Sequence, residues 1–366
     1  MTRRKTTRIA ATMLFTLGLA ASASAQTWTP AQFKAACEAP GHTVTVFGTL
    51  KITSPTLPPP VVVVRSACTV VFTPDAQFEA DNVNLRFTGT MAFQASAKAG
   101  VVFKKAIWSA PRLVASLTGD EGKFIVDESR LATTAGDLSI ALGDISELSV
   151  TGPLGSTGLA LNAAGALTVS AGEKLTATFE TTRVRAGTGM TFSLAGPEAV
   201  LKANLSTFTA AAGQFSLSSP GAKAEVDLAS SQVVAPGGIA IVLPGQESKA
   251  TMASTRLTAL GGSVTLQAGS NGSSFGVLSL DTLTVRAGGA YTMDASLGAN
   301  KGESVLNNST IRAGAAILIR SDREGLTNVL NNALVSPTEI RAFTGASGAC
   351  IEEGNTATAP VVAICQ

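Results

Sequence analysis

A short apolar phrase centred on glycine returns about every two dozen residues along this chain. Its glycines are Gly165, Gly189, Gly213, Gly238, Gly262 and Gly289, at intervals of 24, 24, 25, 24 and 27 residues. A fixed period in this range is the signature of a solenoid, in which each repeat buries its apolar face against its neighbours. The period therefore predicts stacked coils before any single residue is considered.

The apolar spacing inside each repeat selects strands over helices. Leu167 and Val169 alternate with polar residues, and so do Phe215 and Leu217. A period of two is typical of strands, whereas an amphipathic helix repeats every three to four residues. Gly and Pro fall in every repeat, which disfavours an α-solenoid. We predict an all-β, right-handed parallel β-helix over residues 43–344, with coils of 24–27 residues and three short strands each. About twelve coils at ~4.8 Å would form a rod of roughly 58 Å.

Several positions within the coils carry further expectations. The glycine of the phrase is expected in a turn with positive φ, which glycine adopts without steric cost. Two further apolar alternations, Val200 with Leu205 and Val226 with Leu228, are expected to supply the inward residues of the other strands, and Val61–Val64 to form a buried run. The recurrence of Val305–Asn308 at Val329–Asn332 predicts an amide ladder, in which Asn side chains of successive coils hydrogen-bond one another.

Residues 1–25 have the pattern of an export signal. Basic residues stand at the start, an apolar run extends from Ile9 to Ala21, and Ala23–Ala25 provides a small-residue cleavage site. The run is shorter than the ~20 residues that a membrane-spanning helix needs. We therefore expect an exported protein, located in the periplasm, at the cell surface or outside the cell, with no transmembrane segment in its mature chain.

The export signal also carries much of the basic charge. The whole chain has 27 Lys and Arg against 25 Asp and Glu. Without Arg3, Arg4, Lys5 and Arg8 the mature chain has 23 against 25, a net charge of −2. A protein that binds nucleic acid needs a concentrated basic footprint, and none is evident in the sequence. We expect no nucleic-acid partner.

The four cysteines lie in two pairs at the two ends of the chain. An even number in an exported protein favours disulfides, and we predict Cys37–Cys68 and Cys350–Cys365. Each bond would stabilise its end by ~3 kcal/mol in the chain-entropy model. A zinc site is disfavoured, because no Cys-x2-Cys spacing occurs and His42 is the single histidine. We expect no metal and no cofactor, and we expect residues 345–366 to form a loop-rich, disulfide-clamped cap.

A capping helix is predicted within residues 26–42. Thr29 and Gln32 have the spacing of a capping box, and Pro30 takes the first helical position. The helix is expected to stop near Pro40 and to lead into the alternating stretch Thr43–Ile52. This arrangement resembles the N-terminal cap and first coil of pectin-lyase-like right-handed β-helices. The resemblance implies that the helix covers the open end of the core.

One repeat carries a second resemblance. Leu161–Gly172 is similar to the repeats of filamentous-haemagglutinin-type secreted adhesins, closely over about a dozen residues and loosely over about half of the chain. The resemblance implies a secreted β-helix with an adhesive role. The repeat in this chain is longer than that of the family, and no secretion domain or translocator barrel of that type is evident. A protein that transports itself to the surface is therefore not expected.

Pectin-lyase-like folds often host polysaccharide enzymes, but the sequence offers little of their chemistry. Hydrolysis needs one carboxylic acid to protonate the leaving group and another to activate water. The acidic clusters, which we expect at solvated turns, are Asp120-Glu121, Asp127-Glu128, Asp144 with Glu147, and Glu352-Glu353. No Ser-His-Asp set can be assembled around His42, which lies beside the predicted cap. A polysaccharide lyase or hydrolase with an unrecognised site stands as the alternative function.

Arginines form the candidate binding site. Five fall near equivalent positions of the repeat, namely Arg183, Arg185, Arg256, Arg286 and Arg312. Arg185, Arg286 and Arg312 predict a partial basic stripe suited to acidic sugars or envelope phosphates, although exposed strands also need polar residues for solubility alone. No row of acids accompanies the arginines, which disfavours a calcium-dependent lyase. We predict a non-enzymatic rod with a structural or adhesive role at the cell envelope or in the extracellular matrix, whose partner is a polysaccharide there or a surface protein.

Overall fold

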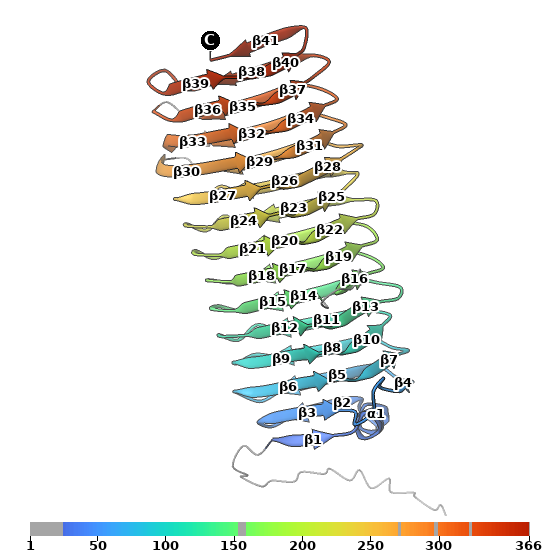
Figure 1. Ribbon diagram of the computed structural model, residues 1–366. Coiled ribbons are helices and arrows are strands. Elements are labelled where there is room, and N and C mark those ends of the chain that lie inside the picture. Colours follow the sequence, from blue (N-terminus) through green and yellow to red (C-terminus); the bar gives the residue numbers. More distant parts are fainter. Residues whose placement is uncertain (1–24, 153–158, 270–271, 296–298, 322–323, 366) are drawn as a thin grey trace, which may run out of the picture.

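The chain winds into about 13 coils stacked along one axis (Figure 1). The computed structural model describes residues 25–152, 159–269, 272–295, 299–321 and 324–365. Each coil gives one strand to each of three parallel sheets, A, B and C. The described residues hold one helix, α1 (Pro30–Glu38). The predicted all-β solenoid is confirmed, with about 13 coils in place of the expected twelve. The predicted export signal lies outside the described residues except for its last position.

The three sheets contain every strand that the structure describes, and the strands of each sheet stack in the order of the sequence. Sheet A consists of β1 (Gln26–Trp28), β3 (Thr49–Thr53), β6 (Ala76–Asp81), β9 (Ala99–Lys104), β12 (Lys123–Asp127), β15 (Glu147–Thr151), β18 (Thr176–Glu180), β21 (Val200–Asn204), β24 (Glu225–Ala229), β27 (Ser248–Ala253), β30 (Gly272–Asp281), β33 (Ala299–Asn307), β36 (Leu326–Leu330) and β39 (Ala349–Glu353). Sheet C consists of β4 (Val61–Val64), β7 (Asn84–Phe87), β10 (Ile107–Ala110), β13 (Arg130–Thr133), β16 (Leu161–Ala163), β19 (Arg183–Ala186), β22 (Thr207–Ala210), β25 (Gln232–Val234), β28 (Arg256–Ala259), β31 (Thr284–Ala287), β34 (Thr310–Ala313), β37 (Ala333–Val335) and β40 (Thr356–Thr358). Sheet B consists of β2 (Thr43–Val46), β5 (Cys68–Phe72), β8 (Met91–Ala95), β11 (Leu113–Leu117), β14 (Leu138–Leu142), β17 (Leu167–Ala171), β20 (Met190–Leu194), β23 (Gln214–Ser218), β26 (Gly238–Leu243), β29 (Val264–Ala268), β32 (Tyr291–Ala295), β35 (Ile317–Ser321), β38 (Glu339–Phe343) and β41 (Val361–Ile364).

Successive coils stack in register around one apolar core. Leu167 of β17 pairs with Met190 of β20, which in turn pairs with Phe215 of β23, and all three side chains are buried. Alternate residues of each strand point inward, so every inward position of one coil rests on the same position of the next. Each outward position forms a row in the same way. The outward rows therefore bring together residues that lie far apart in the sequence.

The first third of the solenoid has an aromatic core. The ring of Trp108 stacks on Phe87 at 5.1 Å between centroids and meets Phe103 edge-on at 5.3 Å. Coil length also varies here. Met91 pairs with Leu113, 22 residues further on, whereas partners later in the chain lie up to 30 residues apart. Variable coil lengths explain why the repeat is blurred in this part of the sequence.

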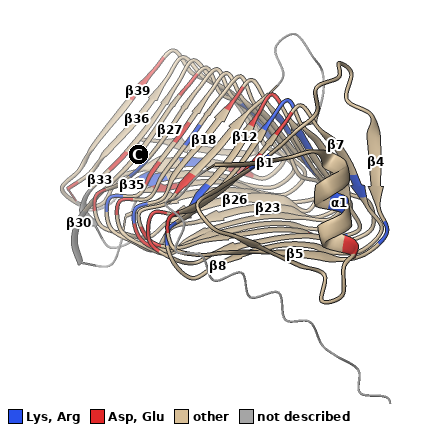
Figure 2. Cartoon of the chain, turned by 90° about the horizontal axis from the view of Figure 1, so that it is seen from below, with Lys and Arg blue, Asp and Glu red and all other residues tan. Residues whose placement is uncertain are grey.

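The helix α1 lies across the first coil, as Figure 2 shows in a view along the axis. Its capping box forms as predicted: the Thr29 backbone N–H donates to Gln32 Oε1 at 2.8 Å, and the Gln32 backbone N–H donates to Thr29 Oγ1 at 3.3 Å. Phe33 inserts into the core and lies 5.9 Å from Trp108 between ring centroids. The predicted Cys37–Cys68 disulfide ties the helix to the start of β5.

The glycines of the repeat lie at the corner between sheets C and B, but the reason is not the predicted one. Of the six, Gly238 alone has a positive φ, of 129°. A Cβ atom at Gly262 would lie 2.4 Å from the carbonyl oxygen of Gly237 in the preceding coil, and one at Gly213 would lie 2.6 Å from that of Thr188. At Gly213 and Gly262 glycine is needed because the backbones of successive coils approach closely.

Residues other than glycine take the left-handed conformation at the two other corners. Leu205, which was expected in the core, has φ of 50° at the corner between sheets A and C and is 59% exposed. Val200 is only half-buried, and Leu201 fills the core in its place. The predicted buried strand Val61–Val64 also alternates, with Val61 60% exposed and Val64 fully buried. The apolar type of a residue therefore does not show whether it lies in a strand or at a corner.

A buried ladder of hydroxyl and amide groups follows the corner between sheets A and C. The Ser309 backbone N–H donates to Asn332 Oδ1 at 2.8 Å, and the Asn332 backbone N–H donates to Asn355 Oδ1 at 3.0 Å. The recurrence in the sequence would align Asn307 with Asn331. In the structure Asn307 pairs with Leu330 instead, so the two Asn-Asn sequences are shifted by one residue relative to each other. The ladder satisfies backbone donors that the turn would otherwise leave buried and unpaired.

The last coil consists of β39, β40 and β41, so strands occupy a segment that was expected to be rich in loops. The predicted Cys350–Cys365 disulfide joins β39 to the residue after β41. Glu352 pairs with the fully buried Val329 of the coil before and so stands at an inward position of the final coil. A charge at this position disfavours the pairing of the exposed last coil with another chain.

Candidate functional site

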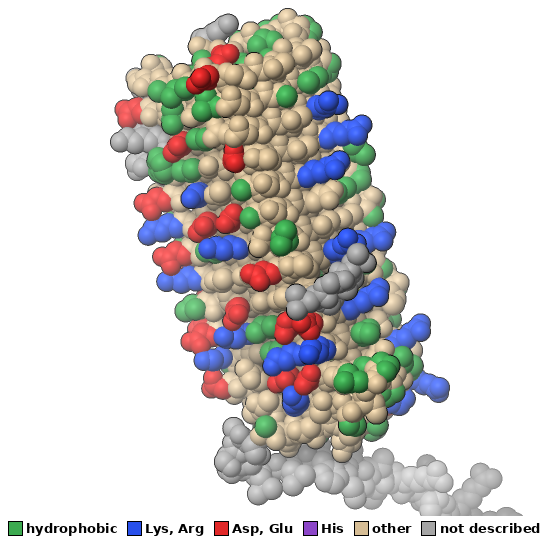
Figure 3. Space-filling model, viewed as in Figure 1, with side chains coloured by type: hydrophobic (Ala, Val, Ile, Leu, Met, Phe, Trp, Pro, Cys, Tyr) green, Lys and Arg blue, Asp and Glu red, His purple; other side chains and the backbone are tan. Residues whose placement is uncertain are grey.

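The outward side of sheet C concentrates positive charge. Its strands carry seven arginines in two rows, namely Arg86, Arg130, Arg183, Arg185, Arg256, Arg286 and Arg312. All seven are exposed. We call this surface the arginine face. In Figure 3 it runs along the right-hand margin, where the blue side chains have no red ones among them.

The strands of sheet C contain no Asp, Glu or Lys. Residues 26–366 contain 23 basic and 25 acidic residues. Seven of the basic ones lie on the strands of this sheet, and outside these strands 16 basic residues stand against 25 acidic ones, a balance of −9. Residues 26–366 are nearly neutral overall, but their charge is thus distributed unevenly among the faces. The sequence shows no concentrated basic footprint because the arginines are spread over more than two hundred residues and meet only when the coils stack.

The predicted stripe residues share one row of the arginine face. Arg286 pairs directly with Arg312 on the next strand. Arg185 belongs to the same row, four coils before Arg286, with Thr209 and Thr258 among the residues between them. The structure therefore brings two of the three predicted residues together and aligns the third with them.

Two members of the face were missed at the level of sequence. Arg86 stands in the row of Arg185, and Arg130 stands beside Ile107 in the other row. Both lie in the part of the chain where the repeat is blurred. The alternation of apolar and polar residues could have identified both. Arg86 directly follows the buried Leu85, and Arg130 directly precedes the buried Leu131, so each arginine takes an outward position of its strand.

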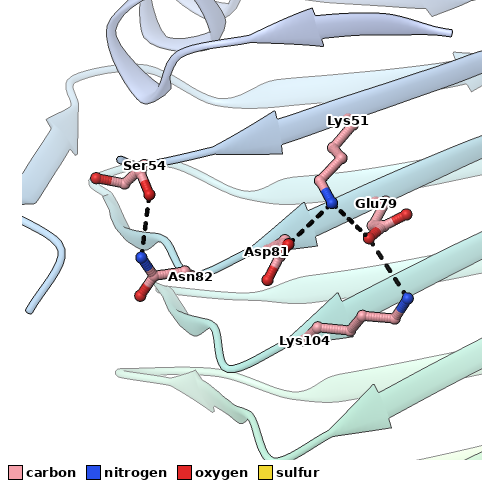
Figure 4. Close-up of polar contacts among 6 residues, drawn as sticks. All are labelled: Lys51, Ser54, Glu79, Asp81, Asn82 and Lys104. Atoms are coloured by element: carbon pink, nitrogen blue, oxygen red, sulfur yellow. Dashed lines mark hydrogen bonds and ion pairs between the residues drawn. The ribbon is translucent and has the colours of Figure 1, made fainter. Parts of the chain in front are cut away.

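Within the described residues, most of these arginines form no salt bridge. In the part of the chain that the structure describes, Arg86, Arg130, Arg185, Arg256, Arg286 and Arg312 form no salt bridge. On sheet A, by contrast, lysines form salt bridges with acidic residues of neighbouring strands (Figure 4). There Lys51 pairs with Glu79 at 3.2 Å and with Asp81 at 2.9 Å, and Lys104 pairs with Glu79 at 3.4 Å. Hydrogen bonds to these two carboxylates raise the pKa of Lys51. Three lysines of sheet A, Lys51, Lys104 and Lys123, thus form salt bridges with acidic residues of neighbouring strands, whereas the strands of sheet C hold no acidic residue.

The corner between sheets B and A also pairs its charges. Lys98 pairs with Glu121 one coil on, and Lys174 pairs with Glu198 at 3.1 Å. The hydrogen bond between the first two groups raises the pKa of Lys98 and lowers the pKa of Glu121. Opposite charges on adjacent coils favour the correct register of the stack. We assign this corner a structural role.

Open depressions mark the arginine face. One is lined by Arg185 together with Thr207, Thr209 and Gln232 of the next two coils. Another is lined by Ile107, Ser109, Arg130 and Asn162. Both are open to solvent rather than enclosed, and each is lined by residues of several successive coils. Each offers a guanidinium beside hydroxyl or amide groups, a combination that suits a ligand with both anionic and hydroxyl groups.

The acidic clusters named from the sequence lie at corners and on sheet A. Asp144 Oδ1 accepts a hydrogen bond from the Glu173 backbone N–H at 2.8 Å, and Glu147 pairs with Lys123 at 3.0 Å. His42 Nδ1 lies 2.9 Å from the Cys37 carbonyl oxygen.

No group of three or more His, Cys, Asp and Glu side chains in the described residues is placed to hold a metal ion. Among the same residues no helix has the length and apolar character needed to cross a membrane.

One further ion pair lies on sheet B. Asp294 is fully buried and accepts a hydrogen bond from Arg320 of the next coil. This bond raises the pKa of the Arg320 guanidinium. The phenol of Tyr291, which points into the core from the same strand as Asp294, has its pKa raised by burial. Asp294 and Arg320 pair across adjacent strands, so we assign this ion pair a structural role in the last coils.

Known proteins offer no further guide to the arginine face. No known protein family matches the chain, and neither a characterised protein nor a solved structure matches it.

Proposed function

We propose that this protein is an exported, non-enzymatic rod with a structural or adhesive role at the cell envelope or in the extracellular matrix. The solenoid supports a rod, because about 13 coils at ~4.8 Å extend over roughly 62 Å. Two disulfides suit an oxidising compartment outside the cytoplasm.

The observation that carries the proposal is the separation of charge among the faces. Sheet A and the corner beside it mix lysines with acidic residues and form salt bridges such as Lys51–Glu79 and Lys174–Glu198, whereas the arginine face leaves six arginines without a salt bridge in the described structure. A rigid scaffold that presents one uncompensated face is suited to hold an anionic partner. The covered first coil and the charged, disulfide-clamped last coil favour a discrete rod over an end-to-end polymer.

The experiment is to locate the protein and to remove it. Native cells are fractionated with and without protease shaving of the surface, and a deletion strain is compared with its parent for attachment to a matrix-coated surface. The proposal predicts an exported protein, accessible to protease or present in the medium, whose loss weakens attachment. A cytoplasmic location would contradict it. Release of new reducing ends from polygalacturonate by the purified protein would contradict the non-enzymatic part and favour the alternative of a polysaccharide enzyme.

A further inference from the structure

We infer that the arginine face binds a linear polyanionic glycan, with the sugar chain lying along the axis of the solenoid. This inference deepens the proposed function and rests on it, since it names the class of partner that the rod would hold. The anionic groups recognised are carboxylates or sulfates carried by sugar rings. A free anion of the same kind is a weaker ligand for this face because it contacts only one or two coils.

The length and direction of the arginine face suit an extended chain. Arg86 on β7 and Arg312 on β34 are nine coils apart along sheet C. At ~4.8 Å per coil the guanidinium groups span roughly 43 Å parallel to the axis. The sheet is a stack of short strands with open depressions on its surface. A ligand that follows the axis would meet a basic residue repeatedly, whereas a compact ligand would meet one or two.

The residues between the arginines are suited to sugars. Thr207 and Thr209 pair with Arg183 and Arg185 across adjacent strands, and Gln232 pairs with Thr207 on the strand after. Their hydroxyl and amide groups both donate and accept hydrogen bonds, as sugar hydroxyls require. Guanidinium groups bind carboxylates and sulfates through paired, charge-assisted hydrogen bonds. The face therefore offers both kinds of contact within one depression.

Stability of the sheet does not explain the arrangement of charge. Arg286 and Arg312 lie directly opposite each other, and Arg183 and Arg185 project from the same side of one strand. Like charges directly opposite in a sheet are destabilising, and the strands of sheet C hold no acidic residue that could offset the pair Arg286 and Arg312. On sheet A, by contrast, Lys123 stands opposite Glu147. A bound polyanion would remove the repulsion on the arginine face.

Two other polyanions fit the face less well. Single-stranded nucleic acids need aromatic side chains on which bases stack, but Phe87, Trp108 and Phe208 of sheet C all point into the core. A membrane surface engages apolar residues beside basic ones. The strongly exposed apolar residues of sheet C, Val61, Val63, Ile107 and Val335, lie toward its two ends, and polar residues fill most of the middle. The glycan is the partner that the composition of the face favours.

The experiment compares purified wild-type protein with two triple variants of equal charge. The first is Arg185→Gln/Arg286→Gln/Arg312→Gln on the arginine face. The matched control is Lys202→Gln/Lys223→Gln/Lys249→Gln, which removes three exposed lysines outside sheet C. Thermal unfolding of all three proteins verifies their folding. Binding is measured by fluorescence anisotropy with labelled polygalacturonate, and repeated with dextran sulfate, neutral dextran, oligo(dT) and phosphatidylglycerol vesicles.

The inference predicts that wild type binds polygalacturonate or dextran sulfate and not neutral dextran, and that added salt weakens binding. The arginine variant should lose roughly tenfold or more in affinity, as expected for three exposed charge-assisted contacts, while the lysine control stays within about twofold of wild type. Equal losses in both variants would overturn the inference, as would tighter binding of oligo(dT) or of vesicles, or no binding of either anionic glycan. If the glycan experiment fails in one of these ways but the deletion strain still attaches poorly, the proposed structural or adhesive function is retained and only the glycan inference is rejected. The failure of one proposal is therefore distinguishable from the failure of the other.

Discussion

Arg286 and Arg312 lie directly opposite each other on neighbouring strands of sheet C, with no salt bridge to either in the described residues. The pairing predicts that Arg286→Gln leaves stability unchanged or raises it by up to about 0.5 kcal/mol, because like charges in direct opposition are destabilising. Chemical denaturation at low salt measures the change. Arg86→Gln is the control, since Arg86 pairs with Val63 and Ser109. A clear loss of stability for Arg286→Gln and not for the control would show that Arg286 supports the sheet.

Close approach of the coils predicts opposite outcomes for two glycines. A Cβ atom at Gly262 would lie 2.4 Å from a backbone oxygen, whereas one at Gly136 would lie 3.4 Å from its nearest neighbour, the carbonyl oxygen of Pro111. Gly262→Ala should lower the free energy of unfolding by about 1–3 kcal/mol through overpacking. Gly136→Ala should be neutral or slightly stabilising, because alanine restricts the unfolded chain. Similar effects at both positions would contradict the steric explanation.

The buried ladder between sheets A and C predicts a cost for removing a hydroxyl. Ser231 Oγ accepts from the Ser206 backbone N–H at 3.2 Å and lies 2.9 Å from the Ala229 carbonyl oxygen. Ser231→Ala would leave a buried backbone donor unpaired and should destabilise the protein by about 1–3 kcal/mol. Ser193→Ala, at an exposed position on sheet B, is expected to change stability by less than about 0.5 kcal/mol. Thermal and denaturant unfolding of both variants provide the comparison.

The inward charge in the last coil predicts a change in assembly. Glu352 pairs with buried Val329, whereas Glu353 pairs with Leu330 on the outer side. Glu352→Val should expose an apolar edge at the open end and promote self-association through unpaired strands. Glu353→Val removes the same charge from the outer side and should stay monomeric. Sedimentation velocity over a concentration series measures the self-association of both variants. Equal self-association would show that Glu352 does not prevent association through the last coil.

The N-terminal helix predicts a dependence of stability on pH. Glu38 accepts a hydrogen bond from the Arg65 backbone N–H at 2.6 Å, and this bond, with Lys34 at 3.2 Å, lowers the pKa of Glu38. A carboxylate with a lowered pKa contributes stability above its unfolded pKa of about 4.3 and loses it as the pH falls through its folded value. Glu38→Gln should therefore reduce the fall of the melting temperature below about pH 4. Glu180→Gln on sheet A is the control, and an unchanged pH profile for Glu38→Gln would contradict the assignment.

Sequence predicted the stacking and the closure of the fold because both depend on local patterns. The alternation of Leu167 and Val169 sets the inward face, the capping box at Thr29 starts α1, and both disulfides form as expected. Corners were harder to predict. Leu205 looks like a core residue by type, but it occupies a left-handed turn that sequence spacing alone did not reveal.

The arginine face could be predicted only in part. Arg286 and Arg312 lie in clear repeats, and their equivalence follows from the spacing. Arg86 and Arg130 lie where coils are as short as 22 residues, so a fixed period does not align them with the others. The absence of acidic residues from the strands of one sheet is invisible in the overall composition. It emerges only when each strand is assigned to its sheet.

The most direct test of the central claim is to map which arginines a glycan covers. The wild-type protein is treated with phenylglyoxal, with and without polygalacturonate, and modified arginines are quantified by peptide mass spectrometry. Arg185, Arg286 and Arg312 are predicted to be protected by the glycan, while Arg112 and Arg341, which lie outside sheet C, react equally in both samples. Equal protection of all arginines, or protection confined to Arg112 and Arg341, would contradict the claim that the arginine face holds the polyanion.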